Sequence, residues 1–81
     1  MISPLLAIRR EIGLSQDEFA LLVAEWPPTI SQIERGARKP TKRLLKTLAE
    51  LGYDITKLQQ EHTEFVKWKR ERIFRELQMA S

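Results

Sequence analysis

The chain has 81 residues, of which 42% are hydrophobic and 31% charged, and its formal net charge is +3. A chain of this length buries one hydrophobic core, so we expect a single folded body. The lack of cysteine excludes disulfides and thiolate sites, and one histidine is too few for a zinc site, so we expect no metal and no cofactor. No apolar run is long enough to span a membrane, and Met1–Pro4 does not start a signal peptide, so we expect a cytoplasmic protein.

The basic residues are concentrated in two blocks. Every charged residue between positions 35 and 46 is basic. The second block, between positions 67 and 75, contains Glu71 as its one acid. A local basic block is typical of a phosphate-binding surface, although a solvated helix face has the same composition.

Capping residues divide the first part of the chain into two short helices. Ser3 and Pro4 suit the N-cap and first position of a helix, apolar residues then recur at three- and four-residue spacing, and Gly13 can close it. Ser15 and Glu18 have the spacing of a capping box, which predicts a second helix that ends near position 24 or 25.

A third helix is predicted to begin at Pro27 or Pro28, because proline is well placed in a first turn, and to end at Gly36. Ile30 and Ile33 are three residues apart and should face the core. The opposite, polar face carries Pro28, Gln32 and Arg35, with Ser31 at its edge.

Two further helices complete the chain. Pro40 and Thr41 end a basic loop and cap a fourth helix, whose leucine stripe leads to Gly52. Asp54 can cap a last helix, and no residue between positions 55 and 79 breaks it. No segment has the alternation of a strand. The sequence therefore predicts an all-α fold of five helices with an extended C-terminal helix.

Two short helices with a tight connection, followed by a basic loop, match the plan of a major-groove reader, because the groove is about 12 Å wide and admits one helix. The residues resemble the lambda-repressor-like (Cro/CI or XRE-type) helix-turn-helix family from about position 5 to 58. The motifs that carry the resemblance are Leu14-Ser15-Gln16, Phe19-Ala20, Thr29-Ile30-Ser31, Ile33-Glu34-Arg35-Gly36 and Arg38-Lys39-Pro40. The resemblance implies a DNA-binding domain over residues 1–60 and a helical extension over residues 61–81.

The resemblance also implies which residues contact DNA. The implied base contacts are Pro28, Thr29, Ser31 and Gln32. The implied phosphate contacts are Gln16, Arg35, Arg38, Lys39, Lys42 and Arg43. Gln32 is the strongest candidate for base reading, because a glutamine amide can pair with N6 and N7 of adenine. The alternative is that Gln16 is simply a polar residue in a first turn and that the cations serve solubility.

The connection between the second and third helices departs from the family pattern. The family has a glycine, an aliphatic residue and a small hydroxyl cap where this chain has Ala24-Glu25-Trp26. Alanine adopts a positive φ less easily than glycine, so we expect a reshaped turn, with Trp26 packed into the core rather than stacked on a base.

Pro27 and Pro28 stand where the family places its main base-reading side chains. Proline offers only apolar contact, for example with a thymine methyl group. Either the specificity comes from Gln32, the basic loop and DNA shape, or this face has partly lost its base-reading role.

Glu34 lies beside the inward-facing residues of the third helix, where an unpaired carboxylate would be costly. The resemblance implies that it forms an ion pair with Arg9 of the first helix. We interpret this pair as structural, so that its loss should unfold the domain rather than change its specificity.

The second helix and the C-terminal extension carry more apolar residues than one small core needs. The residues predicted to form a dimer or partner surface are Leu21, Leu22, Phe65, Trp68, Ile73, Phe74 and Leu77. The extension could instead cover its own monomer, and a basic amphipathic membrane helix is a third option. We expect His62 to be a surface or partly buried residue without a ligand role.

These observations predict a sequence-specific DNA-binding transcriptional regulator, prokaryotic or phage-encoded, that acts as a dimeric repressor on an inverted repeat of a phage- or plasmid-type operator. The alternative is a protein-interaction module on the same fold, an antitoxin or antiactivator that sequesters a regulatory protein or toxin. No arrangement of nucleophile, base and acid, and no phosphate-binding glycine loop, can be assembled from these residues, so we expect no enzymatic activity.

Overall fold

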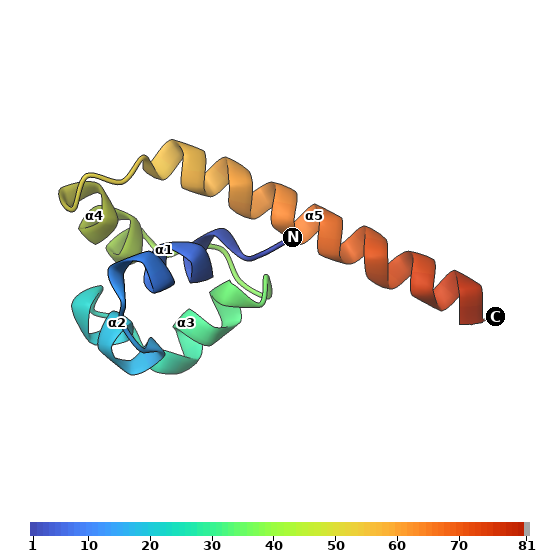
Figure 1. The fold of residues 1–81 in the computed structure, drawn as a ribbon, viewed down its shortest axis with the longest axis horizontal. Helices are drawn as coiled ribbons and strands as arrows, with labels where there is room; N and C mark the ends of the chain where they lie inside the picture. Colours follow the sequence, from blue (N-terminus) through green and yellow to red (C-terminus); the bar gives the residue numbers. More distant parts are fainter. Residues whose placement is uncertain (81) are drawn as a thin grey trace.

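The computed structural model describes residues 1–80 and forms five helices and no strand within them, which confirms the predicted all-α fold (Figure 1). The helices are α1 (Pro4–Ile12), α2 (Gln16–Leu22), α3 (Pro27–Glu34), α4 (Lys42–Glu50) and α5 (Ile55–Ala80). Helices α1 to α4 form a compact body, and the C-terminal half of α5 extends away from it (Figure 1). Ser81, the last residue of the predicted extension, lies outside the described residues.

The predicted helix caps are present. Ser15 Oγ accepts a hydrogen bond from the Glu18 amide at 3.1 Å, and Glu18 Oε1 accepts one from the Ser15 amide at 3.0 Å. These hydrogen bonds favour the ionised carboxylate and lower the pKa of Glu18. Gly13 closes α1 with a φ of 84°, and Asp54 Oδ1 accepts a hydrogen bond from the Lys57 amide at 3.0 Å at the start of α5. Helix α2 ends at Leu22, slightly earlier than predicted.

The core lies between the helices of the body. Its buried residues are Leu5, Phe19, Ala20, Val23, Ile30, Ile33, Leu44, Leu48 and Leu58. Ile30 and Ile33 have no exposed surface, as their spacing predicts. Because these two residues turn one side of α3 into the core, the other side faces outward.

Helix α5 begins as part of the body and ends outside it. Its first half packs on α1 and α4 and buries Leu58, His62 and Phe65, so the predicted boundary at residue 60 falls within a packed helix. His62 is 3% exposed, so its expected surface or partly buried position is wrong. Its Nε2 donates a hydrogen bond to the Arg38 carbonyl at 3.0 Å, and burial lowers the pKa of the imidazole. Among residues 1–80, no helix is long and apolar enough to cross a membrane.

Gly36, two residues after the end of α3, lies against this packed half of α5. It has a φ of 81°, and a Cβ atom there would lie 3.2 Å from Cε2 of the Phe65 ring. Glycine is therefore favoured both by the left-handed backbone and by the close approach of the ring.

We predict that Gly36→Ala lowers the free energy of unfolding by about 2 kcal/mol, because backbone strain and crowding act together. Gly52→Ala is the matched control, since Gly52 has a φ of 93° but no atom within 4 Å of the added methyl group. The control should lose about 1 kcal/mol through strain alone. Urea unfolding of both variants measures the difference, and equal losses would show that the Phe65 contact does not constrain the loop.

Candidate nucleic-acid interface

The C-terminal end of α3 is anchored to α1 and α2 through Glu34. The Glu34 side chain is 6% exposed, and its Oε2 lies 2.6 Å from Nε of Arg9, while Arg9 Nη2 donates a hydrogen bond to Oε1 at 3.2 Å. Gln16 Nε2 also donates to Oε1, at 2.9 Å, and Arg9 Nη1 donates to the Leu14 carbonyl at 2.9 Å. The structure therefore brings the predicted pair Arg9 and Glu34 together and joins three helices at this carboxylate.

Gln16 can donate a second hydrogen bond in this arrangement. Its amide has two N–H donors, and the hydrogen bond to Glu34 uses one of them. Gln16 is half-buried at the start of α2. The remaining donor can still bind a phosphate, so the structural and the DNA-binding interpretations of Gln16 are compatible.

The outward side of α3 presents most of the residues expected to contact bases. Pro28 and Arg35 are exposed, and Ser31 and Gln32 are half-buried. Thr29 is 9% exposed, so little of its side chain is accessible for the base contact that the resemblance implies. The residues of α3 that remain accessible to a duplex on this side are therefore Pro28, Ser31, Gln32 and Arg35.

The turn before α3 differs from both sequence expectations. Ala24 has a φ of 57°, so the turn keeps the left-handed conformation despite the missing glycine and is not reshaped. Trp26 is 78% exposed, so its predicted packing into the core is wrong. The side chain of Glu25 lies inward instead, at 12% exposure, and its carboxylate is 3.9 Å from the Arg43 guanidinium.

Positive charges lie at both ends of the outward face. Arg43, in the first turn of α4, places Nη1 3.5 Å from the Ala24 carbonyl, near the start of α3, and Arg35 stands at its end. The side chains of Arg38, Lys39 and Lys42 are exposed as well. Exposed cations in these positions suit phosphates on either side of a groove occupied by α3.

Helix α5 binds the backbone of the basic loop, residues 35–41 between α3 and α4, a role that the sequence interpretation missed. Lys69 Nζ donates a hydrogen bond to the Arg35 carbonyl at 2.6 Å and lies 5.9 Å from the centre of the Phe65 ring, and His62 binds the Arg38 carbonyl. The carbonyls are thus bound to α5 while both arginine side chains are exposed. His62, Phe65 and Lys69 recur at three- and four-residue spacing, which is the signal that could have shown a shared face.

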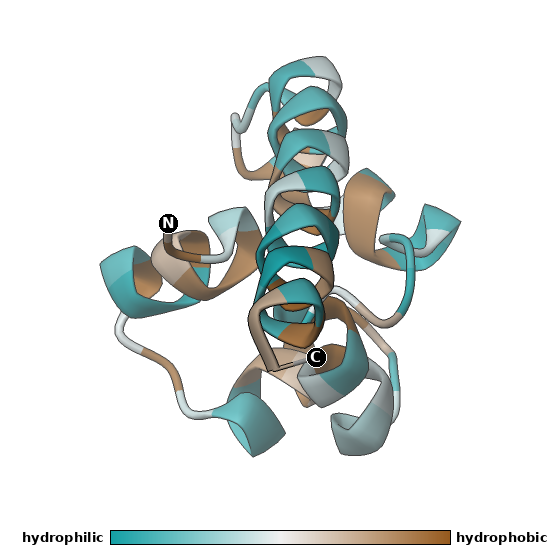
Figure 2. Cartoon of the chain, turned by 90° about the vertical axis from the view of Figure 1, so that its right-hand side faces the viewer, coloured by the Kyte–Doolittle hydropathy of each residue, from teal (hydrophilic) through white to brown (hydrophobic). Residues whose placement is uncertain are grey.

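The predicted partner surface is divided between packed and exposed residues. Phe65 is 5% exposed and so offers almost no surface to a partner, and Trp68 is half-buried and stacks on it with ring centres 6.3 Å apart. The exposed members are Leu21, Leu22, Ile73, Phe74 and Leu77. Along α5, hydrophobic and hydrophilic segments alternate (Figure 2).

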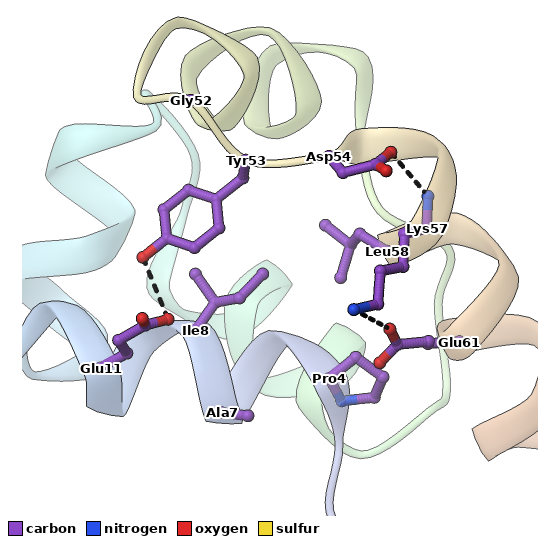
Figure 3. Close-up of a pocket in the computed structure, with 10 residues that line it drawn as sticks. All are labelled: Pro4, Ala7, Ile8, Glu11, Gly52, Tyr53, Asp54, Lys57, Leu58 and Glu61. Atoms are coloured by element: carbon purple, nitrogen blue, oxygen red, sulfur yellow. Dashed lines mark hydrogen bonds and ion pairs between the residues drawn. The ribbon is translucent and has the colours of Figure 1, made fainter.

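A separate pocket lies between α1 and the start of α5 (Figure 3). Its polar groups bind each other: the Tyr53 hydroxyl donates to Glu11 at 3.3 Å, and Lys57 is 3.8 Å from Glu61. None of its lining residues belongs to α3 or the basic loop. Residues 1–80 also contain no cluster of three or more acidic, cysteine or histidine side chains that could hold a metal.

We predict that Glu34→Ala lowers the free energy of unfolding by about 3 to 5 kcal/mol, because it leaves the Arg9 guanidinium partly buried without its partner. Glu76→Ala is the control: its ion pair with Arg72, at 3.8 Å, is exposed, so its loss should cost less than about 1 kcal/mol. Thermal and urea unfolding measure both variants. A Glu34→Ala transition that matches that of the unsubstituted chain would show that the anchor does not stabilise the fold.

A comparison with protein families supports the assignment that this geometry indicates. A family model described as helix-turn-helix matches residues 5–52, which is more than half of the chain and covers α1 to α4. No curated protein and no solved structure is significantly similar to the chain. Helix α5 lies beyond the matched residues. With an anchored α3, an outward polar face and flanking cations, the chain belongs to the Cro/CI-type (XRE) helix-turn-helix family of DNA-binding domains.

Proposed function

We propose that the protein is a sequence-specific transcriptional regulator that acts as a dimeric repressor on an inverted repeat. The observation that carries this proposal is the accessible outward face of α3, flanked by the exposed cations Arg43 at its start and Arg35 at its end. A helix of this kind fits the major groove, where the side chains at its N-terminal end reach base edges. Occupation of an operator is sufficient for repression and requires no cofactor.

The proposed DNA contacts have two roles: some position the protein on the phosphate backbone, and others read base edges. The residues proposed to bind phosphates are Gln16, Arg35, Arg38, Lys39, Lys42 and Arg43. They fix the register of α3 on the duplex but carry no sequence information. Gln32, with Ser31 and Pro28 beside it, is proposed to read base edges, and its amide suits adenine.

The projecting part of α5, within the proposed extension over residues 61–81, supports dimerisation. Ile73, Phe74 and Leu77 are 45%, 61% and 66% exposed and lie at one-, three- and four-residue spacing on a helix that leaves the body. Exposed apolar residues of this kind gain free energy when a second copy covers them. A two-fold dimer places its reading helices about 34 Å apart, one DNA turn, which corresponds to an inverted repeat.

The second candidate function is a protein-interaction module, either an antitoxin or an antiactivator. The 84% exposure of Leu21 on α2 favours it, because neither α3 nor α5 covers this side chain. The two prolines at the start of α3 favour it as well, since they remove hydrogen-bonding side chains from the reading face. The basic loop, in which every charged residue is basic, favours the DNA-binding function over this second candidate.

We predict that the chain binds one duplex selected from a random library at least about a thousandfold more tightly than random duplexes, with an affinity that falls as salt rises. Gln32→Ala should weaken binding to the selected duplex about tenfold or more and leave binding to random duplexes unchanged. Lys39→Ala should weaken binding to the selected and the random duplexes alike. It should also reduce the slope of log affinity against log salt concentration by about one, the value for one phosphate contact. Fluorescence anisotropy across a salt series measures these effects. Equal affinity for all duplexes would contradict sequence-specific regulation.

We predict that Phe74→Glu converts a dimer into a monomer, because a carboxylate would have to be buried in the interface between two α5 helices. The variant should also lose the affinity for the full inverted repeat that comes from two linked sites, while it still binds a half-site. Sedimentation velocity measures the first effect. The control is Leu51→Glu, since Leu51 is 51% exposed on a different helix and should leave the dimer intact. A dimer that survives Phe74→Glu would show that α5 is not the interface.

A further inference from the structure

The start of α3 carries an exposed apolar tip formed by Trp26 and Pro28. Trp26 is 78% exposed, Pro28 is exposed, and Pro27 between them is half-buried. Trp26 occupies the N-cap position, where an oxygen-bearing side chain would ordinarily accept a hydrogen bond from a free amide. The indole has only a donor and cannot do this. The tip therefore contributes little to capping, and an exposed tryptophan next to a reading face requires another explanation.

The backbone holds this tip in a defined position. The Glu25 amide donates to the Ala20 carbonyl at 2.9 Å, and the Trp26 carbonyl accepts from the Thr29 amide at 3.0 Å. The prolines restrict φ on the C-terminal side of the tryptophan, and the left-handed Ala24 precedes it. Because the backbone of the tip is fixed before binding, the protein loses little backbone conformational entropy when a ligand covers the tip.

The charges around the tip indicate what covers it. Arg43 lies beside the turn, with Nη1 3.5 Å from the Ala24 carbonyl, and its side chain is 74% exposed. Its ion-pair partner Glu25 is only 12% exposed, so the charge presented beside the apolar tip is the Arg43 guanidinium. An apolar tip beside an exposed cation complements a surface that has apolar groups between rows of phosphates. The major groove of DNA is such a surface, and the C5-methyl group of thymine is the apolar group that its base edges present.

We propose that Trp26 and Pro28 form a specificity element that recognises the C5-methyl groups of thymine in the major groove. This inference rests on the proposed function, because it assigns a base preference to the same reading face. Proline has no polar side-chain atom and the indole offers a single N–H donor, so the pair would recognise base edges mainly by apolar contact. 5-Methylcytosine carries the same methyl group at the same ring position and should be accepted in place of thymine.

The test uses the duplex selected from a random library, synthesised again with each thymine replaced singly by deoxyuridine. This replacement removes the methyl group and leaves the base-pair hydrogen bonds intact. At one or two thymines of each half-site we expect about fourfold weaker binding, the value of one buried methyl group. Trp26→Ala and Pro28→Ala should bind the thymine duplex more weakly and should respond less to uracil at those positions. Leu21→Ala, at an equally exposed site on α2, is the control and should respond like the unsubstituted chain.

The outcomes separate this inference from the function on which it rests. If the chain prefers the selected duplex but tolerates every uracil, methyl recognition is wrong and sequence-specific binding stands. If Trp26→Ala binds the selected DNA as tightly as the unsubstituted chain, the tip faces another partner and the inference is overturned. If no duplex is preferred, both proposals fail. Thermal unfolding shows whether Trp26→Ala keeps the fold, and Trp26→Phe, which retains an apolar ring, should restore most of the response to uracil.

Discussion

The hydrogen-bonded carboxylate of Glu34 is the constraint on which the arrangement of the site depends. Both of its oxygens are bound, by Arg9 from α1 and by Gln16 from α2. A charge buried at this point is tolerated only because it is fully paired, and the pairing fixes the end of α3 relative to the two helices before it. The rotation of α3, and therefore which side chains face a duplex, follows from this anchor together with the buried Ile30 and Ile33.

A second support acts on the segment after α3. Helix α5 binds two backbone carbonyls of the basic loop, through Lys69 and His62, and packs the Phe65 ring against Gly36. Neither contact uses an arginine side chain, so the loop is held without loss of its positive charge. Beyond the body, the same helix carries the exposed apolar residues Ile73, Phe74 and Leu77. Helix α5 thus links the proposed dimer contact physically to the end of the proposed reading helix.

Local signals in the sequence were sufficient for most of the fold, and tertiary packing decided the rest. The capping box at Ser15 and the spacing of Ile30 and Ile33 depend on neighbours within one helix, so they could be predicted. The position of Trp26 could not, because it depends on the tertiary packing of the turn, in which Glu25 is largely buried and Trp26 is exposed. The burial of Phe65 likewise depends on where α5 crosses the loop, which no local pattern specifies.

The central claim is that DNA contacts the outward face of α3 and the loop after it. Titration of the isotope-labelled chain with its selected duplex, followed by backbone amide resonances, tests this claim residue by residue. We expect the largest changes between residues 26 and 43, with α1 and the start of α5 nearly unchanged. Changes confined to α2 and the end of α5, with α3 unaffected, would contradict it.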